Sequence, residues 1–371
     1  MLPDKKAKVA AVQIWLPAGA YTEGPGKGGL SHFLEHMIFK GSRELEIGEL
    51  ANLIEAAGGD VNAYTMSDAT YYHFTCLPEG LETCLGAMTE AVWWPRFDPA
   101  EVERERRVIF AEIDRANDHP NQRLQEALFQ RAFGANHPFG VPILGTRATV
   151  RRLERHQLLQ HHRRRYAPAG AVVVLAGAVN ENTVRAVLRQ VLQGLPSAFH
   201  RGTTRTGRSP AIPPPSPKGE GPRTFVLRGR SGLAHLELAF AAPPFLHSDA
   251  PALEVLAMIL GMGESSRLYS RLCVEKPLMH DVSTDVFFST GPGLFFLGGA
   301  TAPADVRVAA ENVIRTARSI LEEEPPTKEE IERVRLTFEA EFQFRRERVG
   351  GRAQVVGYAQ LQTGNAHFAQ I

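Results

Sequence analysis

Three ionisable side chains lie within five residues of the segment "GGLSHFLEHMIFKG", which runs from Gly28 to Gly41. On a helix, His32, Glu35 and His36 fall at positions i, i+3 and i+4 and share one face. Two imidazoles one turn apart can bind one metal ion, and the glutamate between them then lies beside that ion. The alternative is a pair of ordinary histidines at the edge of a core, ion-paired to a glutamate.

The same segment carries an apolar stripe on the neighbouring face. Its members fall at i, i+3, i+4, i+7 and i+8: Leu30, Phe33, Leu34, Met37 and Ile38. We therefore expect a helix over about residues 29–39 with one packed face and one polar face. The order HxxEH is the reverse of the HExxH zinc motif, which favours a zinc site over paired histidines.

A catalytic zinc site needs a third protein ligand. The segment "PAEVERERRVIFAEIDRAND" offers Glu105 and Glu112, which are two helical turns apart and point the same way. Buried carboxylates are costly unless they are paired or bind metal. The expected apolar face also carries Val102, Val108, Ile109 and Ile113, and the expected solvent face carries Arg104, Arg107 and Arg115. The alternative is two ordinary surface glutamates.

The order of elements predicts how these residues are positioned. A strand in "KVAAVQIWLPAG" precedes the histidine helix, and "EIGELANLIEAAGG" predicts a second helix that stops at Gly58. The segment "DVNAYTMSDATYYHFTCLP" reads as a hairpin. Further elements are expected as helices near 79–94, 99–117, 121–133, 150–165 and 180–193, with a buried strand in "GAVVVLAGAV".

A Pro- and Gly-rich stretch, residues 200–223, divides the chain. The second half repeats the order of the first, with a strand in "LAHLELAFAAPPF", helices, and a hairpin in "DVSTDVFFSTGPGLFFLGGAT". We therefore expect an α+β fold made by tandem duplication, with each domain a mostly antiparallel sheet packed with helices. The expected domains are 1–199 and 224–371, joined by a linker over 200–223, and the second domain looks incomplete at its end because the pattern stops without a helix cap.

Several segments together resemble the inverzincin zinc metallopeptidases: pitrilysin, insulin-degrading enzyme and the mitochondrial processing peptidase. The resemblance rests on "HFLEH", "GGDVNAYT", "ERERRVIFAEI", "HPFGVPILGT" and "SSRLYSRL", and it covers nearly the whole chain. It is closest to short bacterial chains of the processing-peptidase type. It implies a tandem pair of α+β domains, as the repeat predicts.

The resemblance also assigns roles to residues. It implies that His32, His36 and Glu112, which lies 76 residues after His36, bind one zinc ion per chain. Glu35 would act as the general base of a zinc endopeptidase, and Glu105 would be the second acidic residue of the catalytic apparatus, orienting a histidine.

The resemblance further implies that a peptide or unfolded segment adds as a strand beside "VNAYT", where Asn62, Ala63 and Tyr64 are candidate contacts. For Asn62 the alternative is an ordinary turn or strand-end residue.

The second half departs from the family pattern. Family members carry an Arg and a Tyr in a segment like "SRLxxxLRExxGLxY", where this chain reads "SRLYSRLCVEKPLMH". Cys273 takes the Arg position, His280 takes the Tyr position and Pro277 takes the Gly position. His280 could still donate a hydrogen bond, or it is an ordinary surface histidine. A homodimer, or a heterodimer with a related subunit that supplies the missing pair, is expected. The rival function is a non-catalytic or partner-dependent peptide-binding subunit.

Other partners are disfavoured by composition. The chain has 42 basic and 41 acidic residues and a net charge of +1, which argues against a nucleic-acid partner. No apolar run approaches the roughly 18 residues of a membrane span. Gly24, Gly26 and Gly29 match GxGxxG, but the next strands read as a hairpin, so a tight turn is favoured over dinucleotide binding. A cytoplasmic location is expected from the cysteines, with a periplasmic one open.

Overall fold

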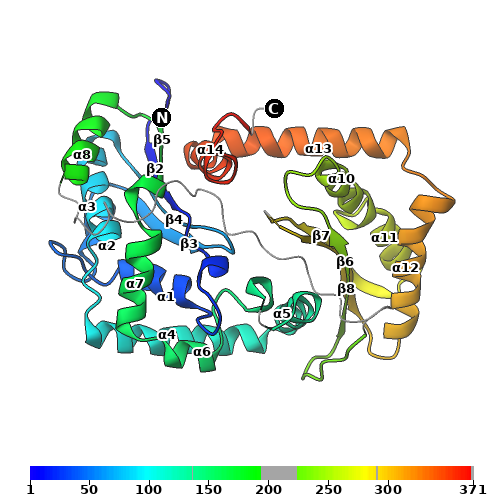
Figure 1. Ribbon diagram of the computed structural model, residues 1–371. Coiled ribbons are helices and arrows are strands. Elements are labelled where there is room, and N and C mark those ends of the chain that lie inside the picture. The colour runs from blue at the N-terminus through cyan, green and yellow to red at the C-terminus, as the bar shows by residue number, and fades with distance from the viewer. Residues whose placement is uncertain (136, 194–223, 290, 369–371) are drawn as a thin grey trace. The chain divides into compact units, whose positions relative to one another are not determined.

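The computed structural model describes residues 1–135, 137–193, 224–289 and 291–368 (Figure 1). These residues form two compact units. Within the described residues, unit 1 consists of Met1–Arg115, 137–193 and 344–368, and unit 2 consists of Ala116–Ala135, 224–289 and 291–343. The expected linker over 200–223 lies outside the described residues and stays a prediction.

Unit 1 contains a five-stranded sheet in the order β1-β5-β2-β4-β3. Its strands are β1 (Leu2–Pro3), β2 (Ala10–Leu16), β3 (Asp60–Thr65), β4 (Thr70–Cys76) and β5 (Val172–Gly177). All neighbours are antiparallel except the short parallel pair of β1 and β5. Strand β3 therefore forms one edge of the sheet, and the predicted hairpin is the pair β3 and β4.

Strand β2 is buried along its whole length because helices cover both faces of the sheet. Its even-numbered residues, such as Val12 and Ile14, pack into the core that also holds the apolar stripe of α1 (Leu30–Ile38). Trp15 faces the other way, stacks on Tyr71 with ring centroids 4.1 Å apart, and donates to the Gln13 side chain. The histidine helix is thus anchored on the inner face of the sheet.

The other helices of unit 1 surround this core. They are α2 (Glu49–Ala56), α3 (Leu81–Trp93), most of α4 (Pro99–Asp118), α6 (Arg147–Arg152), α7 (Arg155–Arg165), α8 (Glu181–Gln193) and α14 (Val349–Thr363). Gly58 has a φ of 69° just beyond α2, as the predicted helix stop requires. The single helix expected over 150–165 is two helices, because the chain is extended at Leu153 and Glu154.

Helix α14 covers the outer face of the unit 1 sheet, although it comes from the second half of the sequence. The Gln13 side chain donates to the Gly350 carbonyl at 2.9 Å, and Arg352 forms an ion pair with Asp4 at 2.9 Å. The helix ends with Gly364 in the left-handed region. The expectation of an uncapped helix was wrong here, because this glycine donates its N–H to the Gln360 carbonyl.

Unit 2 contains a three-stranded antiparallel sheet in the order β6-β8-β7. Its elements are β6 (Ala234–Ala242), β7 (Met279–Phe287), β8 (Gly293–Thr301), α5 (Pro120–Phe133), α10 (Ala250–Gly261), α11 (Arg267–Tyr269), a π-helical segment Ser270–Glu275, α12 (Val306–Glu322) and most of α13 (Lys328–Glu347). Helix α5 packs on this sheet through Phe129, whose ring lies 5.0 Å from that of Phe287.

The α+β class and the mostly antiparallel sheets predicted from the sequence are confirmed. The compact units nevertheless differ from the continuous domains 1–199 and 224–371. Each sheet takes a covering helix from the other half of the chain: α14 covers the sheet of unit 1, and α5 covers the sheet of unit 2. The reason is that each sheet has an apolar outer face that must be buried, and the helices from the same half of the sequence do not cover it.

We predict that Gly357→Ala destabilises the protein. A Cβ at Gly357 would lie 2.2 Å from Trp15 Nε1, and the Trp15 ring is fixed by its stacking on Tyr71. Overpacking of this kind costs about 1–3 kcal/mol. Urea unfolding of Gly357→Ala should show that loss. The matched control is Gly350→Ala on the same helix, where a Cβ meets nothing within 4 Å and stability should change by less than about 1 kcal/mol. Equal stability of the two variants would contradict the packing argument.

Candidate metal centre

Helix α1 begins with a glycine that no other residue replaces without strain. Gly29 has a φ of 91°, and a Cβ there would lie 2.6 Å from the Leu144 carbonyl oxygen. The carboxylate of Glu23 accepts the backbone N–H groups of Gly29 at 2.9 Å and Ser31 at 2.7 Å. The first amides of the helix are therefore occupied by a side chain of the chain itself. This supports the tight-turn interpretation of the GxGxxG match.

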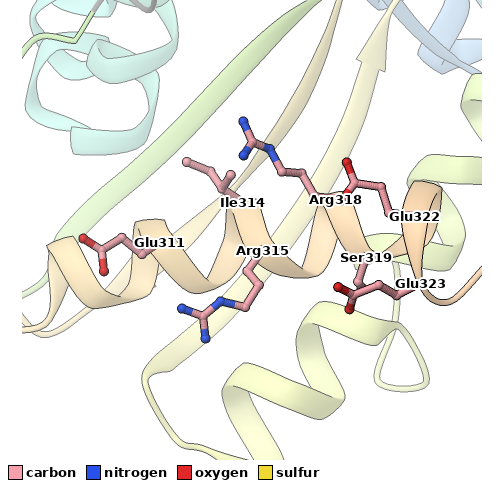
Figure 2. Close-up of a pocket in the computed structure, with 7 residues that line it drawn as sticks. All are labelled: Glu311, Ile314, Arg315, Arg318, Ser319, Glu322 and Glu323. Atoms are coloured by element: carbon pink, nitrogen blue, oxygen red, sulfur yellow. The ribbon is translucent and has the colours of Figure 1, made fainter.

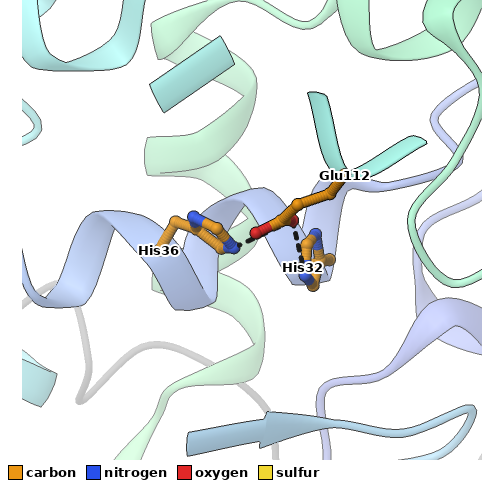
Figure 3. A group of neighbouring side chains, drawn as sticks. All are labelled: His32, His36 and Glu112. Atoms are coloured by element: carbon orange, nitrogen blue, oxygen red, sulfur yellow. Dashed lines mark ion pairs between the residues drawn. The ribbon is translucent and has the colours of Figure 1, made fainter. Parts of the chain in front are cut away.

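His32, His36 and Glu112 converge on one point, as Figure 3 shows. The Glu112 Oε2 atom lies 3.7 Å from His32 Nε2 and 3.5 Å from His36 Nε2. One ligand atom from each residue lies within 4.8 Å of the other two. No other group of three or more His, Cys, Asp or Glu side chains with this geometry occurs in the described part of the chain.

Burial leaves this group ready to bind a cation. Burial, together with the neighbouring His36, lowers the pKa of His32 to about 3, so its imidazole is neutral at neutral pH. The buried Nδ1 of His32 and the buried Oε2 of Glu112 have no hydrogen-bond partner among the described residues. Buried polar atoms without a partner are rare and costly. A cation held by His32, His36 and Glu112 would satisfy the Glu112 oxygen, so the three residues fit a metal ion.

Glu105 fixes the orientation of His36. Its Oε2 lies 3.1 Å from His36 Nδ1, and its Oε1 lies 2.8 Å from Lys40 Nζ. Because Nδ1 faces Glu105, Nε2 is turned toward Glu112. Burial raises the pKa of Glu105, but the hydrogen bonds from His36 and Lys40 outweigh it, so the net pKa is lowered. Burial likewise lowers the pKa of His36, and the surrounding carboxylates more than reverse that effect.

Helix α4 places both glutamates, although its buried face is not quite the expected one. Arg104, Arg107 and Arg115 are exposed, as predicted. Val108 was expected on the apolar face, but it is 41% exposed. The buried positions progress by three and four residues and are Glu101, Val102, Glu105, Arg106, Ile109, Ile113 and Ala116. Val108 lies at the edge of this face, where solvent reaches it.

A residue of the sheet holds the side chain of Glu35, the expected base. The Thr65 hydroxyl of β3 donates to Glu35 Oε2 at 2.5 Å. Burial raises the pKa of Glu35, and the Thr65 hydroxyl and His36 act against it. A carboxyl with a raised pKa beside a candidate metal site is suited to proton transfer. Sequence reasoning missed Thr65, although it stands next to Tyr64 in the quoted segment "VNAYT".

The three candidate substrate contacts lie on the edge strand β3. Asn62 and Tyr64 are exposed and Ala63 is buried, so their side chains alternate across the sheet. Asn62 is a strand residue here, and its Oδ1 accepts the Ala63 N–H at 2.8 Å. Contact of these residues with a substrate stays a prediction.

The candidate from the second half, His280, belongs to unit 2. It is an exposed residue of β7 at an irregularity in the pairing with β8. Cys273 lies in the π-helical segment and packs against the unit 2 core. A role for His280 stays a prediction.

Unit 2 also carries a surface hollow of about 290 Å³ along α12, which Figure 2 shows in close-up. Its lining comes from one helix: Glu311, Ile314, Arg315, Arg318, Ser319, Glu322 and Glu323. Three acidic and two basic side chains line it, so the hollow favours neither anions nor cations. None of the helices in the described part of the chain combines the length and the apolar character that crossing a membrane requires.

Comparison with protein families is decisive for classification. A model described as insulinase (peptidase family M16) matches residues 1–147, and one described as the peptidase M16 inactive domain matches residues 152–338. The chain belongs to peptidase family M16. The M16 matches together span most of the chain, as the resemblance predicted.

Several M16 relatives are named as zinc proteases. One from Mycobacterium leprae is 31% identical over 76% of this chain, and the chain spans 62% of the length of that relative. The zinc protease YmxG of Bacillus subtilis is 27% identical over 84% of this chain and 73% of its own length. A probable mitochondrial-processing peptidase subunit beta of Arabidopsis thaliana is 30% identical over 69% of this chain and 47% of its own length.

Solved structures share the M16 fold. A protease from Helicobacter pylori superposes with a TM-score of 0.88 over 99% of this chain and 88% of its own, at 24% identity. An M16-like peptidase from Alicyclobacillus acidocaldarius has a TM-score of 0.79 over 97% of this chain and 84% of its own, at 22% identity. These likenesses concern the fold alone.

We predict a pH-dependent contribution of Glu23 to stability. Burial raises its pKa from 4.5 to about 8, so the folded chain holds this proton more tightly than the unfolded chain does. The contribution is complete below about pH 4.5 and is lost as the pH rises through about 8. In Glu23→Gln, which cannot ionise, urea unfolding between pH 5 and 8 should therefore lack this loss.

The unfolding series should be run with a chelator, so that metal binding does not contribute to the pH dependence. Glu55→Gln, at an exposed position of α2, is the matched control and should follow the wild-type slope. A constant difference between wild type and Glu23→Gln across this pH range would contradict the prediction.

Proposed function

We propose that this M16 chain is a zinc-dependent endopeptidase that hydrolyses peptide bonds in peptides or unfolded segments. The observation that carries the proposal is the convergence of His32 and His36 on the buried Oε2 of Glu112, which has no hydrogen-bond partner among the described residues, with Glu35 on the histidine helix. The zinc-protease names of the relatives support it.

The donor set suits one zinc ion per chain. Two imidazole nitrogens and one carboxylate oxygen make up the ligand set of several catalytic zinc sites, which leave a position open. When bound, zinc supplies Lewis-acid chemistry, which polarises a carbonyl and acidifies a water molecule. Glu105 then acts outside the ligands, because its bond to His36 Nδ1 keeps the other ring nitrogen directed at Glu112.

Glu35 is the proposed proton carrier. Its carboxylate takes a proton from the attacking water and delivers it to the amine that leaves the scissile bond. Burial supports this role, because it raises the pKa of Glu35 toward neutral pH, which suits a group that must first accept a proton and then give it up. The carboxylate lies on the same helix as His32 and His36, which fixes its distance from the metal ligands.

The proposed substrate site is the free edge of β3. A peptide that adds there as a further strand would make main-chain hydrogen bonds whatever its sequence, and the side chains of Asn62 and Tyr64 would flank it. Strand β3 ends at Thr65, which contacts Glu35, so the peptide would run toward the proposed base.

A second function is supported by the departures in the second half. With Cys273 and His280 at the positions where relatives of this type carry Arg and Tyr, the chain would be a partner-dependent or non-catalytic subunit. The likeness to a mitochondrial-processing peptidase subunit favours this reading as well. The complete set of His32, Glu35, His36 and Glu112 favours the enzyme.

We predict that Glu35→Gln abolishes cleavage and keeps the metal. Cleavage of an unfolded protein or a fluorogenic peptide should fall by roughly 10²–10⁴-fold, because the amide cannot accept the proton. Metal analysis should still find about one zinc per chain. His32→Ala and Glu112→Ala should lose zinc and activity together. Glu55→Gln is the matched control and should retain both, and cleavage that survives Glu35→Gln would exclude the proposed base.

Adding a sister chain should separate the two functions. An autonomous enzyme cleaves alone, and its rate per zinc is unchanged by a related chain that carries the Arg and Tyr pair. A partner-dependent subunit binds zinc alone, cleaves nothing, and gains activity on mixing. The matched control is the sister chain with that Arg and Tyr replaced by the Cys and His found here. Because we favour the enzyme, we expect cleavage by the chain alone, and zinc binding without such cleavage would support the second function.

A further inference from the structure

The hydrogen bond between Thr65 and Glu35 joins two parts of the site that the sequence keeps apart. Thr65 is the last residue of the edge strand β3, and Glu35 lies on α1 between the two histidines. The Thr65 hydroxyl donates to Glu35 Oε2 at 2.5 Å. A carboxylate that accepts a bond from a fixed donor is restricted to fewer rotamers.

The Thr65 hydroxyl is itself held by the hairpin. Thr65 pairs with Thr70 across β3 and β4, and their hydroxyl oxygens lie 3.4 Å apart. Thr70 is fully buried and donates to the Ala18 carbonyl at 2.6 Å. The proton of Thr70 is thus committed to Ala18, and the proton of Thr65 is directed to Glu35.

A pair of buried tyrosines supports Thr70 from the core side. Tyr166 is hydrogen-bonded to Thr70, and its hydroxyl lies 2.9 Å from that of Tyr72. Both rings are fully buried. Buried polar networks in which every member is satisfied keep their geometry. The donor that faces Glu35 therefore belongs to a rigid network.

The alternation of β3 directs Thr65 toward α1. Ala63 is buried with the core that holds the apolar stripe of α1, and Thr65 lies two residues further on the same face. Tyr64, between them, points to the other face and is exposed. Thr65 is thus the one residue of the edge strand seen to hydrogen-bond Glu35 among the described residues.

We propose that Thr65 is a positioning residue for the general base: its hydroxyl holds the Glu35 carboxylate in one orientation and ties it to the strand at which a peptide adds. This inference rests on the proposed function. In the described part of the chain no hydrogen bond or ion pair joins Thr65 to His32, His36 or Glu112, and its hydroxyl faces Glu35 of α1. Its loss should therefore act on the rate of the chemical step, with little effect on metal binding or on substrate affinity.

The test compares four substitutions in the zinc-loaded 371-residue chain. Thr65→Val is nearly isosteric and removes only the donor, whereas Thr65→Ser keeps it. Thr75→Val on β4 is the matched control, because Thr75 pairs with Asp60 at the end of the hairpin opposite to Thr65. Thr65→Ala is a second donor-free variant in case valine at this position prevents folding.

The expected result is a split between kcat and KM. In Thr65→Val and Thr65→Ala, kcat should fall by roughly 10- to 100-fold, the effect of losing one hydrogen bond to a charged group. KM, zinc content and zinc affinity measured by chelator competition should stay within about threefold of wild type. Thr65→Ser should recover most of kcat, and Thr75→Val should match wild type.

A measurement without catalysis tests the contact itself. The urea midpoints of Thr65→Val, Glu35→Ala and the double variant form a double-mutant cycle. If the hydroxyl and the carboxylate interact, the shift of the double variant should differ from the sum of the single shifts. Additive shifts would overturn the proposal.

The outcomes separate this inference from the proposed function. A wild-type chain that cleaves nothing overturns the proposed function and the catalytic role of Thr65 with it. An active wild type whose kcat is unaffected by Thr65→Val overturns the positioning role alone. Loss of zinc, or a raised KM with kcat unchanged, would also overturn it, because Thr65 would then serve the fold or the substrate strand.

Discussion

The packing of α4 against the polar face of α1 is the contact on which the candidate site depends. It buries Glu105 and brings Glu112 beside two imidazoles. An unpaired buried carboxylate costs several kcal/mol, so each must find a partner. Glu105 has two close partners, His36 and Lys40, whereas Glu112 Oε2 lies 3.5 Å and 3.7 Å from the two imidazoles and makes no hydrogen bond to the described residues. This difference suits Glu105 to the proposed orientation of His36 and Glu112 to the proposed binding of a cation.

Helix α1 can bear these groups because it is fixed on three sides. Its apolar stripe lies in the unit 1 core, Glu23 occupies its first amides, and Thr65 holds Glu35 from the sheet. A nine-residue helix would be marginal on its own, so its geometry comes from these contacts. The position of the candidate metal ligands therefore depends on the surrounding fold more than on the motif.

Sequence analysis identified the candidate site residues that share one face of a helix through their spacing. The HxxEH face and the two-turn separation of Glu105 and Glu112 are local geometry, and the structure brings their side chains together. Glu23 could not be found in this way, because it binds amides six and eight residues ahead through a glycine-rich turn whose path depends on positive φ angles. The contact of Thr65 with Glu35 depends on the register of β3 in the sheet, which the periodicity of the sequence does not specify. Roles in substrate contact and in partner binding involve molecules that the chain alone does not contain.

The covering helix α14 could not be placed from the sequence for a different reason. Composition divides the chain near residue 200, whereas the compact units do not follow that division, because α14 packs in unit 1. The outer face of β2 presents Trp15, and Gly357 of α14 allows the helix to approach that ring. The same helix reaches the hairpin turn, where Gln362 donates to Asp68. Asp68 lies in the turn between Thr65 and Thr70, so a segment some 290 residues away in sequence holds the turn from which Thr65 reaches Glu35. The fixed orientation of the proposed base thus depends on both halves of the sequence. The residues that link Gln362 to Glu35 nevertheless all belong to unit 1.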